Sequence, residues 1–277
     1  MCDHCVVESV KGRMLSRRDL FKGAGLGVAA AAMTTTALAT TASTTPAMAA
    51  GHSKVVDMTH VVHEKFPTYF GQQQLFKDQK FNWKEHKFNL FELRVNEHTG
   101  THLDAPLHFS ENGQAVHEIP IASLVCPLCV IDIREKAAGN ADAQVTPDDI
   151  KAWVSANGEI PENACVAMNS GWDKHVATDK FRNVGKDEKM HFPGFHVEAA
   201  KMLAETRAVG MAVDTLSLDY GMSGDFATHY AWLPTNRWGL ECIANLDSVP
   251  ATGATLIVGA PKHQGGSGGP SRIMAMV

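Results

Sequence analysis

The sequence has 277 residues, of which 44% are hydrophobic and 20% charged, and its formal net charge is −5 at pH 7. This composition is typical of a globular protein, and it lacks the excess of basic residues with which nucleic-acid-binding proteins neutralise phosphates. We therefore exclude nucleic acid as a partner. The functional class has to come from motifs along the chain.

Residues 1–49 are predicted to be an export signal rather than part of the fold. Ser16–Lys22 (Ser-Arg-Arg-Asp-Leu-Phe-Lys) resembles a twin-arginine signal with its Phe-Leu order reversed, and Ala47-Met48-Ala49 fits a cleavage site. The alternative is an uncleaved anchor, but the intervening run, rich in Thr and Ala, would make a poor membrane-spanning helix. We expect the twin-arginine machinery to deliver residues 50–277 to the periplasm or another extracytoplasmic space, without stable membrane insertion.

Beyond residue 50, extended and helical patterns alternate. We expect strands over residues 54–60, 88–95, 127–133, 164–168 and 211–213, and a last strand over 255–258. We expect a helical turn over 120–124, a helix after the N-cap residue Thr146 and a helix over 196–206. Residues 72–87 are polar and irregular, as in a lid. About 228 residues suffice for one domain, and the alternation indicates the α/β class.

Cys126 and Cys129 have the C-x-x-C spacing of redox and zinc sites. Their apolar neighbours predict a buried strand, in which the two Cα atoms would lie about 10 Å apart, too far for a disulfide. No second C-x-x-C follows in residues 50–277 to complete a four-thiolate site. We predict that these two cysteines, with Cys165 and Cys242, are structural, and a redox role remains the alternative.

The densest concentration of metal-ligand chemistry lies in residues 98–108. Gly100 and Pro106 disfavour a helix there. In an extended segment side chains alternate faces, so His98, His102, Asp104 and His108, which share one parity, would point to the same side. Imidazole and carboxylate groups converging in this way predict a divalent metal site. The alternative is a histidine-rich surface loop without metal.

This stretch fits the pattern H-x-G-T-H-x-D-x-P-x-H and resembles the metal-dependent cyclase family, which includes bacterial kynurenine formamidases and isatin hydrolases. Further similarity lies in His-Phe-Pro-Gly-Phe (191–195), in the Asp-Thr-Leu-Ser-Leu-Asp-Tyr-Gly part of 209–221, in Glu-Cys-Ile-Ala-Asn-Leu from Glu241, and in the glycine-rich segment 265–272. The resemblance covers most of residues 54–277. It implies a single compact domain, with a mixed β-sheet and flanking helices.

The resemblance also implies two metal sites that share a carboxylate. The first would be held by His98, His102 and Asp104, and the second by Asp104, His229 and Glu241. Mixed nitrogen and oxygen ligands suit Zn²⁺ or Mn²⁺, two ions per chain. His108 would be the general acid/base that works with metal-activated water. A fourth ligand, or a partner that orients a ligand, are the alternatives for His108.

These features predict an exported metal-dependent amidohydrolase that cleaves a non-peptide C–N bond in a small aryl formamide or cyclic amide. The family's formamidases carry a substrate-facing tryptophan near residues 66–71, where this chain has Tyr69 and Phe70. This departure, together with export, favours a lactam over formylkynurenine; packing of both aromatics on the core is the alternative. Trp172 is either a pocket wall or a core residue. We also expect a homodimer or a higher homo-oligomer.

The rival function is a periplasmic metal-binding or carrier protein without catalysis. Such a protein would keep the metal ligands, but it would have no need of His108.

Overall fold

The computed structural model describes residues 54–277, so the predicted signal in residues 1–49 lies outside the described residues. The described chain forms two compact units, one of residues 77–93 and one of residues 54–76 and 94–277. In this described part, no helix has the length and apolar character needed to cross a bilayer.

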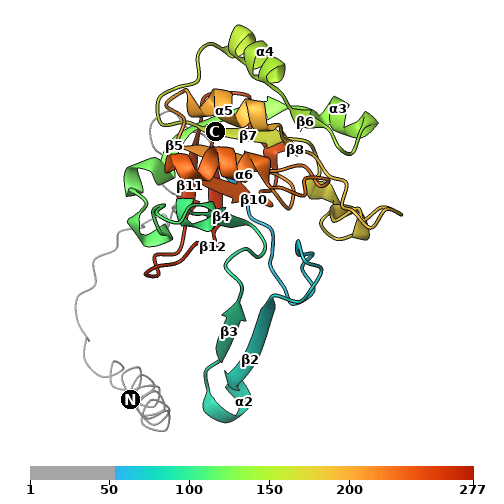
Figure 1. The fold of residues 1–277 in the computed structure, drawn as a ribbon. Coiled ribbons are helices and arrows are strands. Elements are labelled where there is room, and N and C mark those ends of the chain that lie inside the picture. The colour runs from blue at the N-terminus through green and yellow to red at the C-terminus, as the bar shows by residue number, and fades with distance from the viewer. Residues whose placement is uncertain (1–53) are drawn as a thin grey trace, which may run out of the picture. The chain divides into compact units, whose positions relative to one another are not determined.

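The larger unit is built on a nine-stranded mixed sheet in the order β1-β13-β11-β5-β7-β9-β10-β4-β12. Its strands are β1 (Val55–Asp57), β4 (His102–Asp104), β5 (Val125–Asp132), β7 (Cys165–Asn169), β9 (Gly210–Val213), β10 (Trp238–Glu241), β11 (Ala254–Gly259), β12 (Gly268–Pro270) and β13 (Arg272–Met276). Figure 1 labels β4, β5, β7, β10, β11 and β12 of this sheet. Strands β5, β7, β9 and β10 run parallel, and the remaining neighbours pair antiparallel. Two short strands, β6 (Gln144–Val145) and β8 (Gly194–Phe195), pair separately.

Helices connect the parallel strands. They are α3 (Arg134–Gly139), α4 (Pro147–Asn157), α5 (Val197–Ala204) and α6 (Ala227–Trp232). Single turns of 3₁₀ helix are η1 (Pro106–Phe109), η2 (Val116–Glu118), η3 (Ile121–Leu124), η4 (Asp173–His175), η5 (Asp179–Phe181), η6 (Leu233–Thr235) and η7 (Leu246–Ser248). Helix α4 begins as predicted, because the Asp149 carboxylate accepts hydrogen bonds from the backbone N–H and the hydroxyl of Thr146.

The sheet is buried on both faces. Alternate residues of β5 show this, since Cys126 and Leu128 belong to one apolar cluster while Cys129 and Ile131 belong to the other. The second cluster also contains residues of α4, α5 and α6, so these helices pack on that face. Burial raises the pKa of the Cys126 and Cys129 thiols to about 12. All four cysteines of the described chain are buried and unpaired, in agreement with a structural role.

The predicted α/β class and mixed sheet are confirmed, and so are the strands near residues 55, 90, 127, 165 and 211. The prediction that residues 255–258 form the last strand is wrong, because β12 and β13 follow. β12 consists of two glycines and a proline and shows no alternation of apolar and polar residues, while β13 has a largely apolar sequence that the prediction did not include.

The smaller unit, residues 77–93, contains most of a β-hairpin, so the prediction of an irregular segment at 72–87 is also wrong. The elements of the hairpin are β2 (Leu75–Phe81), α2 (Trp83–His86) and β3 (Leu90–Val95). Lys80 and Glu92 form an ion pair of 2.8 Å, and the Lys77 ammonium lies 4.2 Å from the centre of the Phe91 ring. Asn82 caps α2 by accepting a hydrogen bond from the backbone N–H of Glu85.

Candidate metal centre

Strand β4 carries two of the predicted ligands on one face. His102 lies directly opposite Glu241 of β10, and Asp104 lies opposite Gly239. Leu103 and its partner Leu240 point the other way, into the core. The register of β4 and β10 therefore gathers two carboxylates and an imidazole on the same side of the sheet. A side chain at 239 would crowd the Asp104 carboxylate, since its Cβ would lie 3.3 Å from Oδ2.

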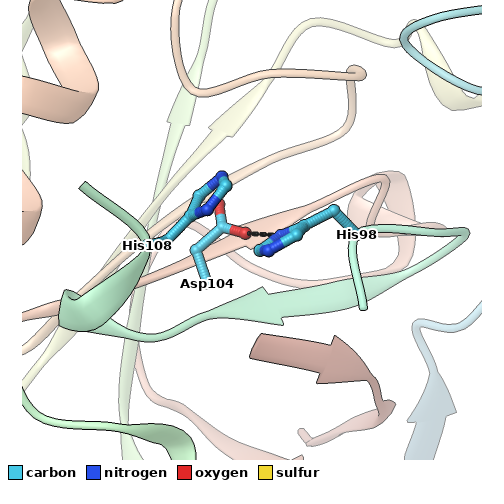
Figure 2. Close-up of side chains that lie close together, drawn as sticks. All are labelled: His98, Asp104 and His108. Atoms are coloured by element: carbon cyan, nitrogen blue, oxygen red, sulfur yellow. Dashed lines mark hydrogen bonds and ion pairs between the residues drawn. The ribbon is translucent and has the colours of Figure 1, made fainter. Parts of the chain in front are cut away.

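His98 and His108 reach this cluster from outside the strand. His98 precedes a tight bend at Gly100, which has a φ of +71°, and His108 lies in η1. Their rings stack with centres 3.7 Å apart, and the His98 Nδ1 lies 2.7 Å from the Asp104 Oδ1 (Figure 2). The prediction of one extended segment over 98–108 therefore holds only for His102–Asp104.

The structure brings all six predicted site residues together. Two groups of three have candidate ligand atoms within 4.8 Å of one another, and both contain Asp104. These groups are His98, Asp104 and His108, and His102, Asp104 and Glu241. The Nε2 atom of His229, from α6, lies 3.1 Å from the Glu241 Oε1 and 3.6 Å from the Asp104 Oδ2. The grouping differs from the predicted one, in which His98 shares a metal with His102 and His108 holds none.

Hydrogen bonds at Nδ1 orient the imidazole rings of His102 and His229. The Nδ1 of His102 is 2.8 Å from the Gly100 carbonyl, and the Nδ1 of His229 is 2.6 Å from the Asp219 Oδ2. In both rings this leaves Nε2 facing the Asp104 and Glu241 carboxylates. Asp219 also accepts hydrogen bonds from the backbone N–H groups of Thr228 and His229, which fixes the start of α6.

The donor set fits a divalent cation. Asp104 is fully buried and Glu241 is 6% exposed, yet the described residues that line the adjoining pocket include no lysine or arginine. The buried atoms His102 Nε2 and Asp104 Oδ2 have no hydrogen-bond partner. Lone pairs left unsatisfied beside two buried carboxylates are what a bound metal would use, and mixed nitrogen and oxygen donors suit Zn²⁺ or Mn²⁺.

Burial and mutual charge perturb the protonation of these groups. Burial raises the pKa of Glu241, and the nearby Asp104 raises it further. Burial alone would raise the pKa of Asp104, but the surrounding histidines, His102 foremost, hold it well below its usual value. Burial would lower the pKa of His102, but Asp104 and Glu241 raise it to about 9. For His108, burial dominates and lowers the pKa to about 4.

A pocket of about 400 Å³ opens over the cluster and is lined by His98, His102, His108, His229 and Glu241. Its apolar wall consists mainly of four aromatic side chains, which are Tyr69, Phe70, Phe109 and Phe226. Tyr69 and Phe226 have ring centres 5.7 Å apart, and Phe109 and Phe226 have ring centres 5.4 Å apart. A flat, partly apolar molecule could be enclosed beside the ligand atoms.

The structure bears on two alternatives that the sequence left open. Tyr69 and Phe70 both line the pocket; Tyr69 also packs against an apolar core cluster, while Phe70 is 71% exposed. Trp172 is a core residue, because it is buried in an apolar cluster with Phe66 and Phe181 and its Nε1 donates to the Phe181 carbonyl. A larger cavity of about 1110 Å³ lies between residues 63–73 and 176–184, and it contains none of the candidate ligands.

Sequence reasoning missed three contributors to the site. Asp219 lies within the segment 209–221 that resembles the family, but the sequence gave it no role, although its position after a buried strand was a usable signal. Phe109 and Phe226 lie outside every predicted element, and nothing in the local pattern points to a pocket wall.

Comparisons with known proteins agree with this geometry. The family model Cyclase, described as "Putative cyclase", matches residues 56–220. Isatin hydrolase of Roseibium aggregatum is 34% identical over 192 residues, 66% of this chain and 73% of that protein. Kynurenine formamidase of Salinibacter ruber is 29% identical over 206 residues, which are 70% of this chain and 87% of that protein. The structure of isatin hydrolase A from Labrenzia aggregata bound to benzyl benzoate superposes with a TM-score of 0.76 at 35% identity, covering 81% of this chain and 93% of that one.

Proposed function

The chain belongs to the Cyclase family, and on that basis we propose that it is a metal-dependent hydrolase whose substrate is a small, planar cyclic amide. Hydrolysis of a non-peptide C–N bond is the chemistry of its isatin hydrolase and kynurenine formamidase relatives. The aromatic wall of Tyr69, Phe109 and Phe226 beside the candidate ligands is the observation that supports a planar cyclic amide as the substrate.

We assign the metal ligands to His98, His102, Asp104, His229 and Glu241. Asp104 can serve two ions, because its Oδ1 faces His98 and His102 while its Oδ2 faces His229. Two ions per chain, zinc or manganese, match this arrangement of donors. A bound divalent cation polarises a carbonyl group and lowers the pKa of water.

His108 is the residue that we assign to proton transfer. Hydrolysis adds water to the carbonyl carbon, breaks the C–N bond and requires a proton on the departing nitrogen. With its pKa lowered to about 4 by burial, the His108 imidazole is neutral near pH 7 and can accept the proton that water loses. Its ring lines the pocket, so the same imidazole can return that proton to nitrogen.

The pocket favours a lactam or aryl amide over an aliphatic amide. Aromatic side chains gain most from planar, apolar partners, which stack or pack edge to face. A volume of about 400 Å³ suits a molecule of one or two rings. The relative that is 34% identical is an isatin hydrolase, which supports a fused cyclic amide as substrate.

We also propose that the enzyme works outside the cytoplasm as a homodimer or a higher homo-oligomer. The location is supported by the twin-arginine pattern at Ser16–Lys22 and the cleavage pattern at 47–49. A reporter fused after residue 60, with Arg17 and Arg18 replaced by lysine as control, would test export. Light scattering would test the assembly.

The deciding experiment measures turnover of isatin, N-formylkynurenine and a set of cyclic imides by protein loaded with Zn²⁺ or Mn²⁺. Chelator-sensitive turnover, fastest with the lactam, is the expected result. Full metal occupancy with no turnover across the panel would refute the substrate assignment.

The variant His108→Ala separates an enzyme from a metal carrier. We expect it to bind metal as the wild type does and to lose at least 100-fold in turnover, the usual scale for a general acid/base. His63→Ala is the matched control, because His63 is exposed and lies outside the pocket. If His108→Ala turned over substrate like the wild type, the assignment of His108 would be wrong.

A further inference from the structure

The glycine-rich segment 265–269 packs against the Nε2 side of the His98 ring, opposite Asp104. Ser267 makes the contact, with its Oγ 3.0 Å from the Nε2 of His98. Its Oγ also lies 2.6 Å from the Oε2 of Glu97, and its backbone N–H donates to the same oxygen at 3.1 Å. The opposite ring nitrogen of His98, Nδ1, faces Asp104 at 2.7 Å.

The direction of these hydrogen bonds follows from their chemistry. An ionised carboxylate can only accept, so the hydroxyl proton of Ser267 goes to Glu97. The Ser267 oxygen can then only accept from His98, which requires a proton on Nε2. With Nε2 protonated, Nδ1 is the nitrogen that can bind a cation at the cluster; without a cation, Nδ1 can keep a proton and donate it to the Asp104 carboxylate 2.7 Å away.

The other carboxylate oxygen of Glu97, Oε1, also has a hydrogen-bond partner. His263, which is partly exposed, places its Nε2 2.5 Å from the Glu97 Oε1. Glu97 is therefore fixed at both oxygens and cannot turn away from Ser267 without losing a partner.

The glycines in this segment are needed for close approach. A Cβ on Gly268 would lie 2.9 Å from the Cε1 of His98 and 2.3 Å from a backbone oxygen. A Cβ on Gly266 would lie 2.0 Å from the Nε2 of His263 and 2.5 Å from the Oε1 of Glu97. The two glycines flank Ser267, so the composition of the loop matches its contact with this chain of side chains.

We propose that Ser267 and Glu97 are positioning residues that fix the Nε2–H tautomer and the orientation of His98, and thereby set the metal affinity of the cluster. The proposal rests on the assignment of His98 as a ligand. It gives the glycine-rich segment a role in metal binding that does not involve contact with the metal or the substrate. Such outer partners usually contribute about 10–100-fold to metal affinity.

The test measures Zn²⁺ and Mn²⁺ affinity of the full chain, stripped of metal, by competition with a chromophoric chelator. We expect Ser267→Ala to weaken binding of at least one ion 10–100-fold and Ser267→Thr, which keeps the hydroxyl, to restore it. Ser271→Ala is the control, because Ser271 is buried nearby and its hydroxyl donates to the Gly269 carbonyl. Unchanged affinity in Ser267→Ala would overturn the proposal.

A second readout does not depend on the Ser267 variants folding well. The ¹⁵N chemical shifts of the histidine rings report which nitrogen carries the proton, and we expect Nε2–H at His98 in the zinc-loaded protein. In Glu97→Gln the amide can donate to Ser267, which turns the hydroxyl proton towards His98 and disfavours the Nε2–H form, so we expect metal affinity to fall as it does in Ser267→Ala. Nδ1–H at His98 in the zinc-loaded wild type would contradict the proposal. A wild type that binds neither ion would instead refute the metal assignment itself.

Discussion

Asp214 allows a quantitative test of how burial acts on a charge in this fold. It follows β9, is 1% exposed, and accepts hydrogen bonds from the backbone N–H groups of Ser170 and Trp172 and from the Ser170 hydroxyl. Burial raises the pKa of Asp214 to about 7, although these hydrogen bonds favour the charged form. The ordinary value for this group is 3.8.

The folded protein therefore binds the Asp214 proton more tightly than the unfolded chain. A group of this kind stabilises the fold fully below pH 3.8, and the contribution is lost as the pH rises towards 7. The slope approaches 1.4 kcal/mol per pH unit, so about 2 kcal/mol should be lost between pH 5 and pH 6.5. In Asp214→Asn the amide oxygen can accept from both backbone N–H groups and the amide nitrogen can donate to Ser170, without titrating.

The assay is urea unfolding of chelator-treated wild type and Asp214→Asn at pH 5, 6.5 and 8. The stability of the variant relative to the wild type should increase by about 2 kcal/mol from pH 5 to pH 6.5 and change little above pH 7.5. Asp148→Asn is the control, since that side chain is 90% exposed. Parallel curves for wild type and Asp214→Asn would show that the hydrogen bonds hold the carboxylate ionised and would refute the reasoning.

Two further predictions concern the site. Tyr69→Ala should raise the KM for an aryl lactam about 3–10-fold with a smaller effect on kcat, because one aromatic contact contributes about 0.5–1.5 kcal/mol; steady-state kinetics would show it, and an unchanged KM would mean that substrate does not contact this wall. Removing metal should lower the Tm, because the buried Asp104 and Glu241 lose the cation that offsets their repulsion; calorimetry should show recovery with Zn²⁺ or Mn²⁺, and identical melting with and without chelator would contradict it.

The local sequence was enough to predict that the candidate ligands lie close together, but not in which directions their side chains point. His98, His102, Asp104 and His108 lie within eleven residues, so their proximity could be predicted without a fold. Their directions could not. The strand over this stretch has only three residues, and His98 and His108 arrive through a bend and a 3₁₀ turn. Alternation along a strand predicts side-chain direction only as far as the strand extends.

The first strand of the hairpin, β2, escaped prediction for a different reason. Most of β2 is exposed and its centre is polar (Lys-Asp-Gln-Lys), whereas the equally exposed β3 was predicted because its sequence keeps apolar residues. Alternation of apolar and polar residues arises when one face of a strand is buried. A strand without a buried face need not carry this signal, and the polar sequence of β2 therefore looks like that of a loop.

Partners that orient the ligands depend on contacts between distant parts of the chain. Ser267 lies 169 residues from His98 along the chain, and the two meet because β12 pairs with β4. Serine beside glycine is common in loops, so nothing local distinguishes this serine from Ser271. Residues that orient the candidate ligands in this way can be identified only when the order of the strands in the sheet is known.

The register of the sheet therefore determines which side chains meet at the candidate metal centre. β4 lies between β10 and β12, which places Glu241 opposite His102 and Gly268 opposite Asp104. A slip of β10 by one residue would turn Glu241 towards the core and Leu240 towards the ligands. The facing pair Leu103 and Leu240, both fully buried, opposes that slip because it would expose one leucine to a polar cluster. The apolar side of these two strands thus holds the metal-binding side in register.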